Sequence, residues 1–171
     1  MKIKLVADIR NKNAGLPRQK NSFLSLLLLL IRNYLPITLA VRDIMEGNVV
    51  TASPGDSVLS GLSKMIEKEV WSLLIERSGL PVGVVTERDI LRRCISKRFS
   101  PETMKLEQIM SSPIVTIDQN STLADAMHVM VDKSVRRLFV VDNGKIVGRV
   151  TQTGLFSSLL DLMMRLSSTS L

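Results

Sequence analysis

The alternation of hydrophobic and polar residues predicts the same order of strands and helices twice along the chain. In the first copy, residues 49–52 predict a short strand, which ends at the turn residues Ser-Pro-Gly-Asp at 53–56. Apolar residues at helical spacing then predict a helix with one hydrophobic face: Val58, Leu62, Met65 and Ile66. Two strands joined by a turn and a closing helix follow, at residues 71–76, 82–86 and 87–98.

The second copy has the same order. Residues 114–117 predict a strand, and Asn120-Ser121 is a candidate cap for a helix that carries Leu123, Met127 and Met130. Residues 137–141 and 146–151 predict two strands joined by the hairpin turn Asn143-Gly144, and a last helix runs to about residue 165.

The two copies align without a gap at an offset of 65 residues. Ile44-Met45 aligns with Ile109-Met110, and Thr86 aligns with Thr151. A repeat of fixed period indicates one supersecondary unit built twice. Two units are too few for a solenoid, so the sequence predicts an α+β protein of two βαββα lobes that face each other across an approximate two-fold axis.

Composition limits the class of protein. The chain has 171 residues, of which 45% are hydrophobic and only 4% aromatic, so aliphatic side chains and methionines must fill the core. Cys94 is the one cysteine, which excludes an internal disulfide and a cysteine metal cluster and favours a cytoplasmic protein. The lone histidine, His128, lies in a predicted helix, and no acid–base pair, nucleophile arrangement or metal set stands out. We therefore expect a protein that is not an enzyme and that needs no metal or cofactor.

The net charge of +7 is concentrated at the start of the chain, where residues 1–21 carry six Lys or Arg against one Asp. A basic arm at residues 2–20 is a candidate contact for nucleic acid or an anionic membrane, with a solvated tail as the alternative. Residues 23–31 form an apolar run that is too short to span a bilayer. This run fits a short helix packed on the body or on a dimer partner, a wrongly assigned start, or a signal or membrane anchor.

The sharpest local feature is the segment from Gly83 to Asp89, at a junction between a strand and a helix. Thr86 can cap the helix with Asp89 in its first turn, and a capping role alone explains both residues. The same geometry offers a hydroxyl and free backbone N–H groups to an anion, and Asp89 can accept hydrogen bonds from a vicinal diol such as a ribose. The aligned position in the second copy is Gly154, which has no carboxylate.

The second copy supplies cations that the first copy lacks. Arg136-Arg137 stands where the first copy has Trp71-Ser72. Because successive strand residues face opposite sides, we expect at most one of the two arginines to face a given cleft. If the lobes face each other, an arginine lies opposite Thr86 and Asp89, whereas the mirror pocket lacks both the carboxylate and the cations. The sequence thus predicts one competent polar site and one degenerate site.

Residues 41–165 resemble a tandem pair of cystathionine β-synthase (CBS) domains, often called a Bateman module. The first copy carries the resemblance at residues 41–45 (Val-Arg-Asp-Ile-Met) and 82–89 (Val-Gly-Val-Val-Thr-Glu-Arg-Asp). The second copy carries it at residues 109–116, 135–142 and 146–148. The resemblance divides the chain into a leader (1–40), repeat 1 (41–101), repeat 2 (102–165) and a tail (166–171).

The resemblance implies that an adenine nucleotide (AMP, ADP or ATP) binds in the cleft between the repeats. The family's threonine and aspartate fall on Thr86 and Asp89, its basic residues fall on Arg136 and Arg137, and the stretch that brackets adenine falls on residues 113–115. The implied nucleotide-binding residues are Thr86, Arg88, Asp89, Pro113, Ile114, Val115, Arg136 and Arg137. The degenerate second site comprises Val49, Val50, Trp71 and Thr151.

The resemblance also implies a homodimer, shaped as a disc, that acts as a stand-alone sensor on an effector protein in trans. Two alternatives remain open from the sequence: a nucleic-acid-binding protein that uses the basic arm, and a purely structural interaction module with an empty cleft.

Overall fold

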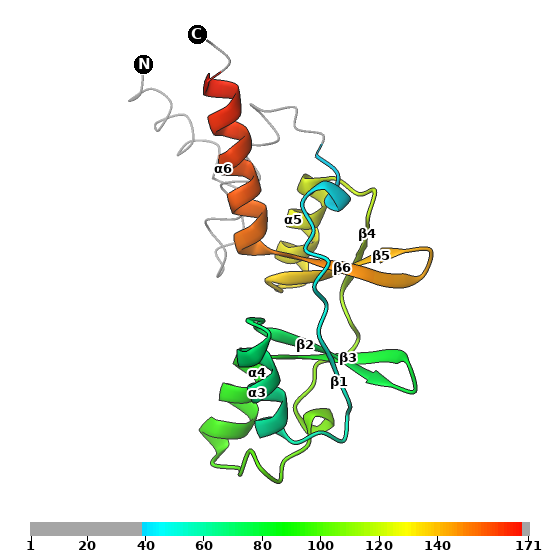
Figure 1. Ribbon diagram of the computed structural model, residues 1–171, viewed down its shortest axis with the longest axis vertical. Helices are drawn as coiled ribbons and strands as arrows, with labels where there is room; N and C mark the ends of the chain where they lie inside the picture. The colour runs from blue at the N-terminus through cyan, green and yellow to red at the C-terminus, as the bar shows by residue number, and fades with distance from the viewer. Residues whose placement is uncertain (1–38, 169–171) are drawn as a thin grey trace.

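The computed structural model describes residues 39–168, which form two lobes with the same order of elements (Figure 1). The predicted basic arm and the apolar run 23–31 lie outside the described residues. Lobe 1 contains β1 (Thr51–Ala52), α3 (Val58–Glu67), β2 (Ser72–Arg77), β3 (Leu80–Thr86) and α4 (Glu87–Asp89). Lobe 2 contains β4 (Thr116–Asp118), α5 (Leu123–Asp132), β5 (Arg137–Asp142), β6 (Lys145–Thr151) and α6 (Gln152–Ser168). The predicted α+β class with two βαββα repeats is confirmed.

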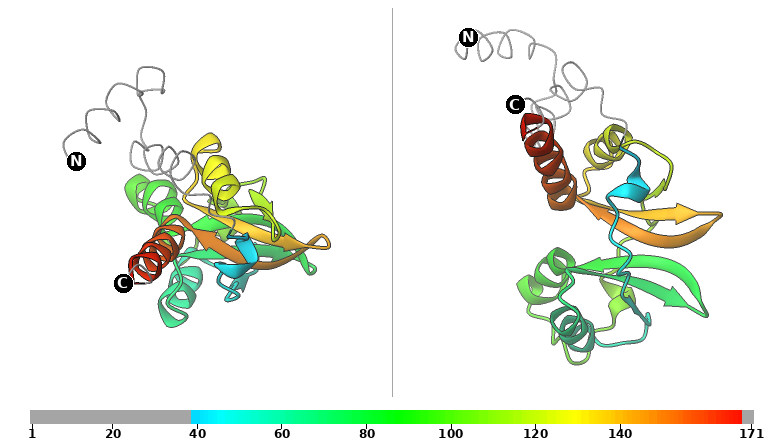
Figure 2. Two further views of the ribbon diagram at one scale, coloured as in Figure 1. Left: turned by 90° about the horizontal axis from the view of Figure 1, so that it is seen from above. Right: turned by 45° about the horizontal axis from the view of Figure 1, so that its top comes forward.

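Each lobe has a three-stranded sheet in which a parallel pair is followed by an antiparallel hairpin, in the orders β1-β2-β3 and β4-β5-β6. The sheets lie toward the middle of the molecule and the main helices lie on its outer sides (Figure 2). Strand residues alternate accordingly. Leu73 and Ile75 pack in the helix-side core of lobe 1, whereas Leu74 and Phe139 are buried outside both helix-side cores.

The helix predicted at residues 87–98 begins at Glu87 but is not uniform. After α4 the chain continues as a π-helical turn, η2 (Ile90–Cys94), and a 3-10 turn, η3 (Ile95–Lys97). It ends where Arg98 adopts a left-handed conformation with φ of 60°.

The helix in repeat 2 is capped by Thr122 rather than by Asn120 or Ser121, which corrects the prediction. Thr122 accepts a hydrogen bond from the backbone N–H of Asp125, and the Asp125 carboxylate accepts one from the backbone N–H of Thr122. This reciprocal capping box lowers the pKa of the Asp125 carboxyl, because the hydroxyl and the N–H of Thr122 both bind its ionised form. A cap at Ser121 would have no such partner, since residue 124 is an alanine.

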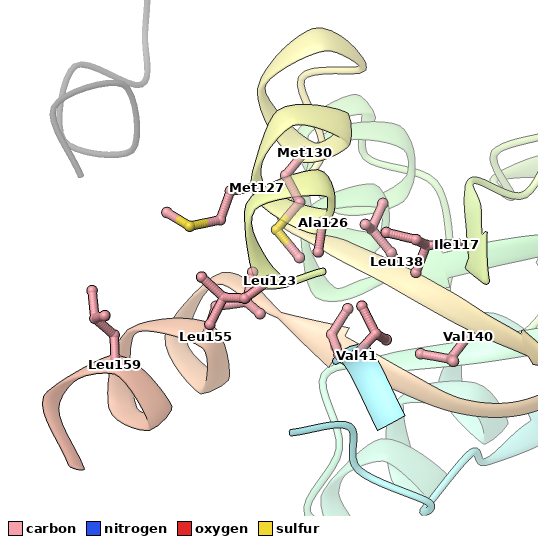
Figure 3. Close-up of a cluster of buried hydrophobic side chains, with 11 residues drawn as sticks. Val41, Ile117, Leu123, Ala126, Met127, Met130, Leu138, Val140, Leu155 and Leu159 are labelled. Atoms are coloured by element: carbon pink, nitrogen blue, oxygen red, sulfur yellow. The ribbon is translucent and has the colours of Figure 1, made fainter. Parts of the chain in front are cut away.

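The two repeats exchange the segments that lead into them. Val41 begins the short 3-10 helix η1 (Val41–Asp43) of repeat 1, yet it is fully buried in the core of lobe 2 beside α5 and α6 (Figure 3). Leu106 begins η4 (Leu106–Gln108) of repeat 2, and together with Ile109 it is fully buried in the core of lobe 1. The lobes in space therefore differ from the repeats in the sequence.

Backbone hydrogen bonds fix each exchanged segment to a strand of the opposite repeat. Glu46 and Arg149 exchange two backbone bonds of 2.9 Å, and Ser111 and Val84 exchange bonds of 2.8 and 3.0 Å. Each crossing lies on a glycine. A Cβ at Gly148 would stand 2.9 Å from the Glu46 backbone oxygen and 3.0 Å from the Met45 sulfur, and a Cβ at Gly83 would stand 2.7 Å from the Met110 sulfur. The close approach of the exchanged segments accounts for a glycine at both positions.

No helix within residues 39–168 is long and apolar enough to cross a membrane.

We predict that Gly148→Ala lowers the free energy of unfolding by about 1–3 kcal/mol, because the methyl group meets a backbone oxygen that cannot move independently. Gly55→Ala is the matched control, since nothing lies within 4 Å of a Cβ there and its φ is not in the left-handed region. Urea denaturation of the two variants and the wild type measures the difference. Equal stability of the two variants would contradict the close crossing.

Candidate functional site

A cavity of about 240 Å³ lies between the lobes. All eight residues predicted to bind a nucleotide line this cavity, so the structure brings them together. The sequence analysis did not include five further lining residues: Val84, Ser111, Ser134, Val135 and Phe139. The binding role of the whole set stays a prediction.

Three parts of the chain form the walls of the cavity. Thr86, Arg88 and Asp89 come from the end of β3 and from α4 in lobe 1. The segment 111–115 connects the lobes and includes a cis Ser112–Pro113 peptide bond. Arg137 is the first residue of β5 in lobe 2, Arg136 directly precedes it, and Phe139 lies two residues further along the strand. Both lobes and the connecting segment are therefore needed to complete the cavity.

Thr86 and Asp89 form a capping box at the edge of the cavity. The Asp89 Oδ2 atom accepts hydrogen bonds from the Thr86 backbone N–H at 2.9 Å and from the Thr86 hydroxyl at 2.7 Å. The Thr86 Oγ1 atom accepts one from the Asp89 backbone N–H at 3.3 Å. The two residues therefore form a helix cap, and both also line the cavity. The Asp89 side chain is 13% exposed, so its carboxylate reaches solvent through a small area only.

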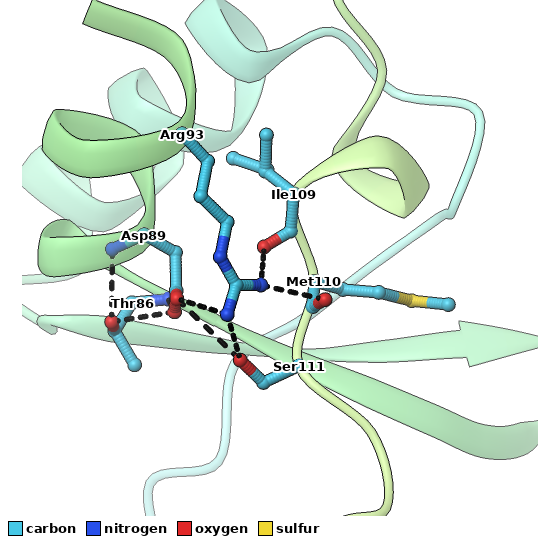
Figure 4. Close-up of polar contacts among 6 residues, drawn as sticks. All are labelled: Thr86, Asp89, Arg93, Ile109, Met110 and Ser111. Atoms are coloured by element: carbon cyan, nitrogen blue, oxygen red, sulfur yellow. Dashed lines mark hydrogen bonds and ion pairs between the residues drawn. The ribbon is translucent and has the colours of Figure 1, made fainter. Parts of the chain in front are cut away.

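Arg93 does not line the cavity but contacts two residues that do, Asp89 and Ser111, and the sequence alone did not predict this role. Its guanidinium donates hydrogen bonds to the backbone oxygens of Ile109 at 2.6 Å and Met110 at 2.9 Å, and to the Ser111 hydroxyl at 3.0 Å (Figure 4). It also lies 3.4 Å from Asp89 Oδ1. Arg93 therefore joins the candidate ribose acceptor to the exchanged segment of repeat 2. The available signal was its position four residues after Asp89 on a predicted helix.

Both Arg136 and Arg137 line the cavity, which corrects the expectation that at most one would do so. The alternation rule fails here because β5 begins at Arg137, so Arg136 precedes the strand. Both guanidinium groups reach Glu87 of lobe 1, at 3.7 Å for Arg136 and 3.1 Å for Arg137. Arg137 also donates a hydrogen bond to the backbone oxygen of Trp71.

Arg137 is a largely buried cation whose side chain is 16% exposed. Burial lowers the pKa of its guanidinium, the nearby Glu87 carboxylate opposes this change, and the positive charge of Arg136 adds to it. A guanidinium removed from water in this way gains from any anion placed against it, because it has lost part of its hydration.

A second cavity of about 620 Å³ lies at the position related to the first by the repeat. Trp71 and Thr151 line it as predicted, whereas Val49 and Val50 are not among its lining residues. Val50 instead packs against the core of lobe 1, and its backbone oxygen accepts the Leu74 N–H.

The second cavity is not poor in charge, which corrects the sequence prediction. Three carboxylates and three guanidinium groups line it: Glu46, Glu69, Glu87, Arg136, Arg137 and Arg149. Arg149 carries one of these charges, and its counterpart in the first cavity is Val84, so a comparison limited to Thr151, Gly154, Trp71 and Ser72 does not reveal it. Arg149 is buried in an ion pair with Glu46 at 2.9 Å. At Gly154, where the first cavity has Asp89, only the backbone N–H bonds to the Thr151 hydroxyl, at 3.0 Å.

A model of the CBS domain family matches residues 41–96 and again residues 106–161. The chain is 34% identical over 116 residues to an uncharacterised protein of Methanopyrus kandleri, covering 67% of this chain and 59% of that protein. It is 31% identical over 111 residues to the CBS domain-containing protein YhcV of Bacillus subtilis, covering 65% of this chain and 79% of that protein. This chain thus spans about three fifths of the archaeal relative. Neither relative is named for an enzymatic activity.

Solved structures share the fold. A CBS-domain protein from Burkholderia ambifaria superposes with a TM-score of 0.69 at 25% identity, covering 72% of this chain and 95% of that one. A hexameric CBS-CP12 protein from bloom-forming cyanobacteria superposes with a TM-score of 0.66 at 26% identity, covering 71% of this chain and 68% of that one.

We predict that Arg93→Ala lowers the free energy of unfolding by roughly 1–2 kcal/mol, because two backbone carbonyls and Asp89 lose a charged donor. Arg92→Ala is the control, since Arg92 is the exposed neighbour and only its backbone oxygen takes part in a bond described here, with Ser96. Chemical denaturation of both variants measures the difference. Equal stability would show that the Arg93 contacts add nothing to the attachment of the exchanged segment.

Proposed function

The chain belongs to the CBS domain family, and from this premise we propose that it is a regulatory module that binds an adenine nucleotide between its lobes. The proposed site is the cavity of about 240 Å³. The observation that carries the proposal is that residues far apart in the sequence, from both lobes and the connecting segment, meet around this one cavity with an apolar part and a cationic part.

The apolar part suits a flat base. Val84, Ile114, Val115 and Phe139 offer hydrocarbon and aromatic surface, and the connecting segment also offers backbone groups to the polar edge of a base. Asp89 stands at the junction with the polar part, where its carboxylate can accept a ribose hydroxyl once its contact with Arg93 or Ser111 is rearranged.

The cationic part suits phosphates. Arg88, Arg136 and Arg137 are contributed by the two lobes, and the first two are exposed, so a chain of phosphates can extend from the cavity toward solvent. Guanidinium groups bind phosphate oxygens through paired hydrogen bonds, which makes this arrangement favourable for AMP, ADP or ATP. No metal is required for this mode of binding.

A regulatory role follows from where the ligand would sit. A nucleotide held by side chains of both lobes stabilises one relative placement of the lobes over others. We propose that this placement is transmitted to an effector protein in trans, and that the module acts as a homodimer. The hexameric assembly of the CBS-CP12 neighbour shows that a related protein oligomerises.

We predict that an adenine nucleotide at about 100 times its Kd raises the stability of the wild type by about 2.7 kcal/mol, which is several degrees in Tm. Asp89→Ala should abolish most of this shift, because the ribose acceptor is lost. Thermal unfolding with AMP, ADP, ATP, GTP and S-adenosylmethionine measures it.

Asp125→Ala is the matched control for that experiment, because Thr122 and Asp125 form the same capping box at a distance from the cavity. It should lower the Tm without changing the ligand-induced shift. If no ligand shifts the wild type, the module is an interaction domain with an empty cleft or a nucleic-acid-binding protein. If Asp89→Ala and Asp125→Ala respond alike, Asp89 is only a helix cap.

A further inference from the structure

Glu87 forms ion pairs with Arg136 and Arg137, the two arginines that the proposed function assigns to phosphate binding. Its Oε2 atom lies 3.1 Å from a terminal nitrogen of Arg137, and its Oε1 atom lies 3.7 Å from one of Arg136. Both arginines line both cavities, and Glu87 lines the second. A carboxylate of the protein therefore stands against the cations on one side, and the proposed phosphate position lies on the other.

The fold does not require this cluster of charges. The backbone contact beneath it occurs in both repeats: the Glu87 N–H donates to the Trp71 oxygen at 3.4 Å, and the Gln152 N–H donates to the Arg136 oxygen at 2.9 Å. The aligned side chains of the other repeat are Gln152, Trp71 and Ser72, which carry no charge. The same backbone contact thus forms without an ion pair. The charged cluster of Glu87, Arg136 and Arg137 has no counterpart at the equivalent position of the other repeat.

The contacts of Glu87 also link the lobes. Arg137 belongs to lobe 2. Its two hydrogen-bond partners, the Glu87 carboxylate and the Trp71 backbone oxygen, belong to lobe 1. A phosphate in the first cavity attracts the same guanidinium groups from the other side, and an arginine that turns fully toward it weakens its contact with Glu87. An anionic ligand and Glu87 therefore compete for the same two cations, and a neutral ligand does not.

We propose that Glu87 is an internal anion that competes with the ligand's phosphates for Arg136 and Arg137, and so lowers the preference of the site for phosphorylated ligands over the bare nucleoside. This inference rests on the proposed function for the place where phosphate binds. Glu87 acts through the arginines and is a positioning residue that sets specificity.

The test is calorimetric titration of wild type and Glu87→Gln with ATP, AMP, adenosine and inorganic tripolyphosphate. Glu87→Gln keeps the shape of the side chain and removes its charge. The affinity for ATP, AMP and tripolyphosphate should rise by roughly three- to fivefold, which corresponds to the loss of one partly exposed ion-pair partner. The affinity for adenosine should stay within about twofold. The gain for phosphates should shrink as salt is raised, because the released cations are partly exposed.

Glu69→Gln is the matched control. Glu69 lines the same second cavity but belongs to neither ion pair with the arginines, so its loss changes the net charge equally without freeing them. It should leave all four affinities within about twofold. Thermal unfolding of both variants establishes that they are folded.

The outcomes separate the two proposals. If the wild type binds ATP and Glu87→Gln matches it, or if Glu69→Gln gives the same gain, the role of Glu87 is overturned and the nucleotide site stands. If adenosine gains as much as ATP, competition for phosphate is likewise overturned. If Glu87→Gln strengthens tripolyphosphate binding but neither protein prefers ATP to tripolyphosphate, the role of Glu87 stands and the adenine site falls. If none of the four ligands binds either protein, both proposals fail.

Discussion

The exchange of leading segments between the repeats is the constraint on which the rest of the structure depends. Neither repeat can complete its hydrophobic core from its own residues, because Val41 fills the core of lobe 2 and Leu106 and Ile109 fill that of lobe 1. The two lobes must therefore fold against each other. Burial of three aliphatic side chains contributes several kcal/mol, at about 1.5–3 kcal/mol each. The same crossings place the segment 111–115 between the sheets, and this segment is one wall of the first cavity.

Two cavities of different character arise from one repeated backbone. The strand order, the two crossings and the glycine at each crossing recur in both halves, so the difference between the cavities comes from their side chains. Position 84 is an apolar valine in the lining of the first cavity, whereas the aligned Arg149 is a cation paired with Glu46 in the lining of the second. Position 89 is an aspartate, whereas the aligned Gly154 offers only its backbone. The repeated unit thus gives both cavities the same backbone, and different residues at these two aligned positions give them different chemistry.

Polar groups around the first cavity take part in both folding and the proposed binding. Asp89 closes a capping box, contacts Arg93 and faces the cavity, and Arg93 in turn holds the exchanged segment. Arg137 ties lobe 2 to lobe 1 through Glu87 and the Trp71 carbonyl while it lines the same cavity. A ligand that takes these groups must alter contacts that hold the lobes together. This shared use is the physical basis of the proposed regulation by a bound nucleotide.

The sequence by itself determined the repeat, the α+β class, the main strands and helices, and eight of the residues around the first cavity, because these follow from local periodicity, from aligned motifs and from the family resemblance. Tertiary structure alone decided which lobe each leading segment completes, since Val41 and Leu106 are apolar in either arrangement. It also decided the partners of long side chains. Arg93 and Glu87 looked like ordinary polar residues on a helix, and Arg149 like one polar position in a strand. Their roles depend on groups many positions away, brought within hydrogen-bond distance only when the two sheets face each other.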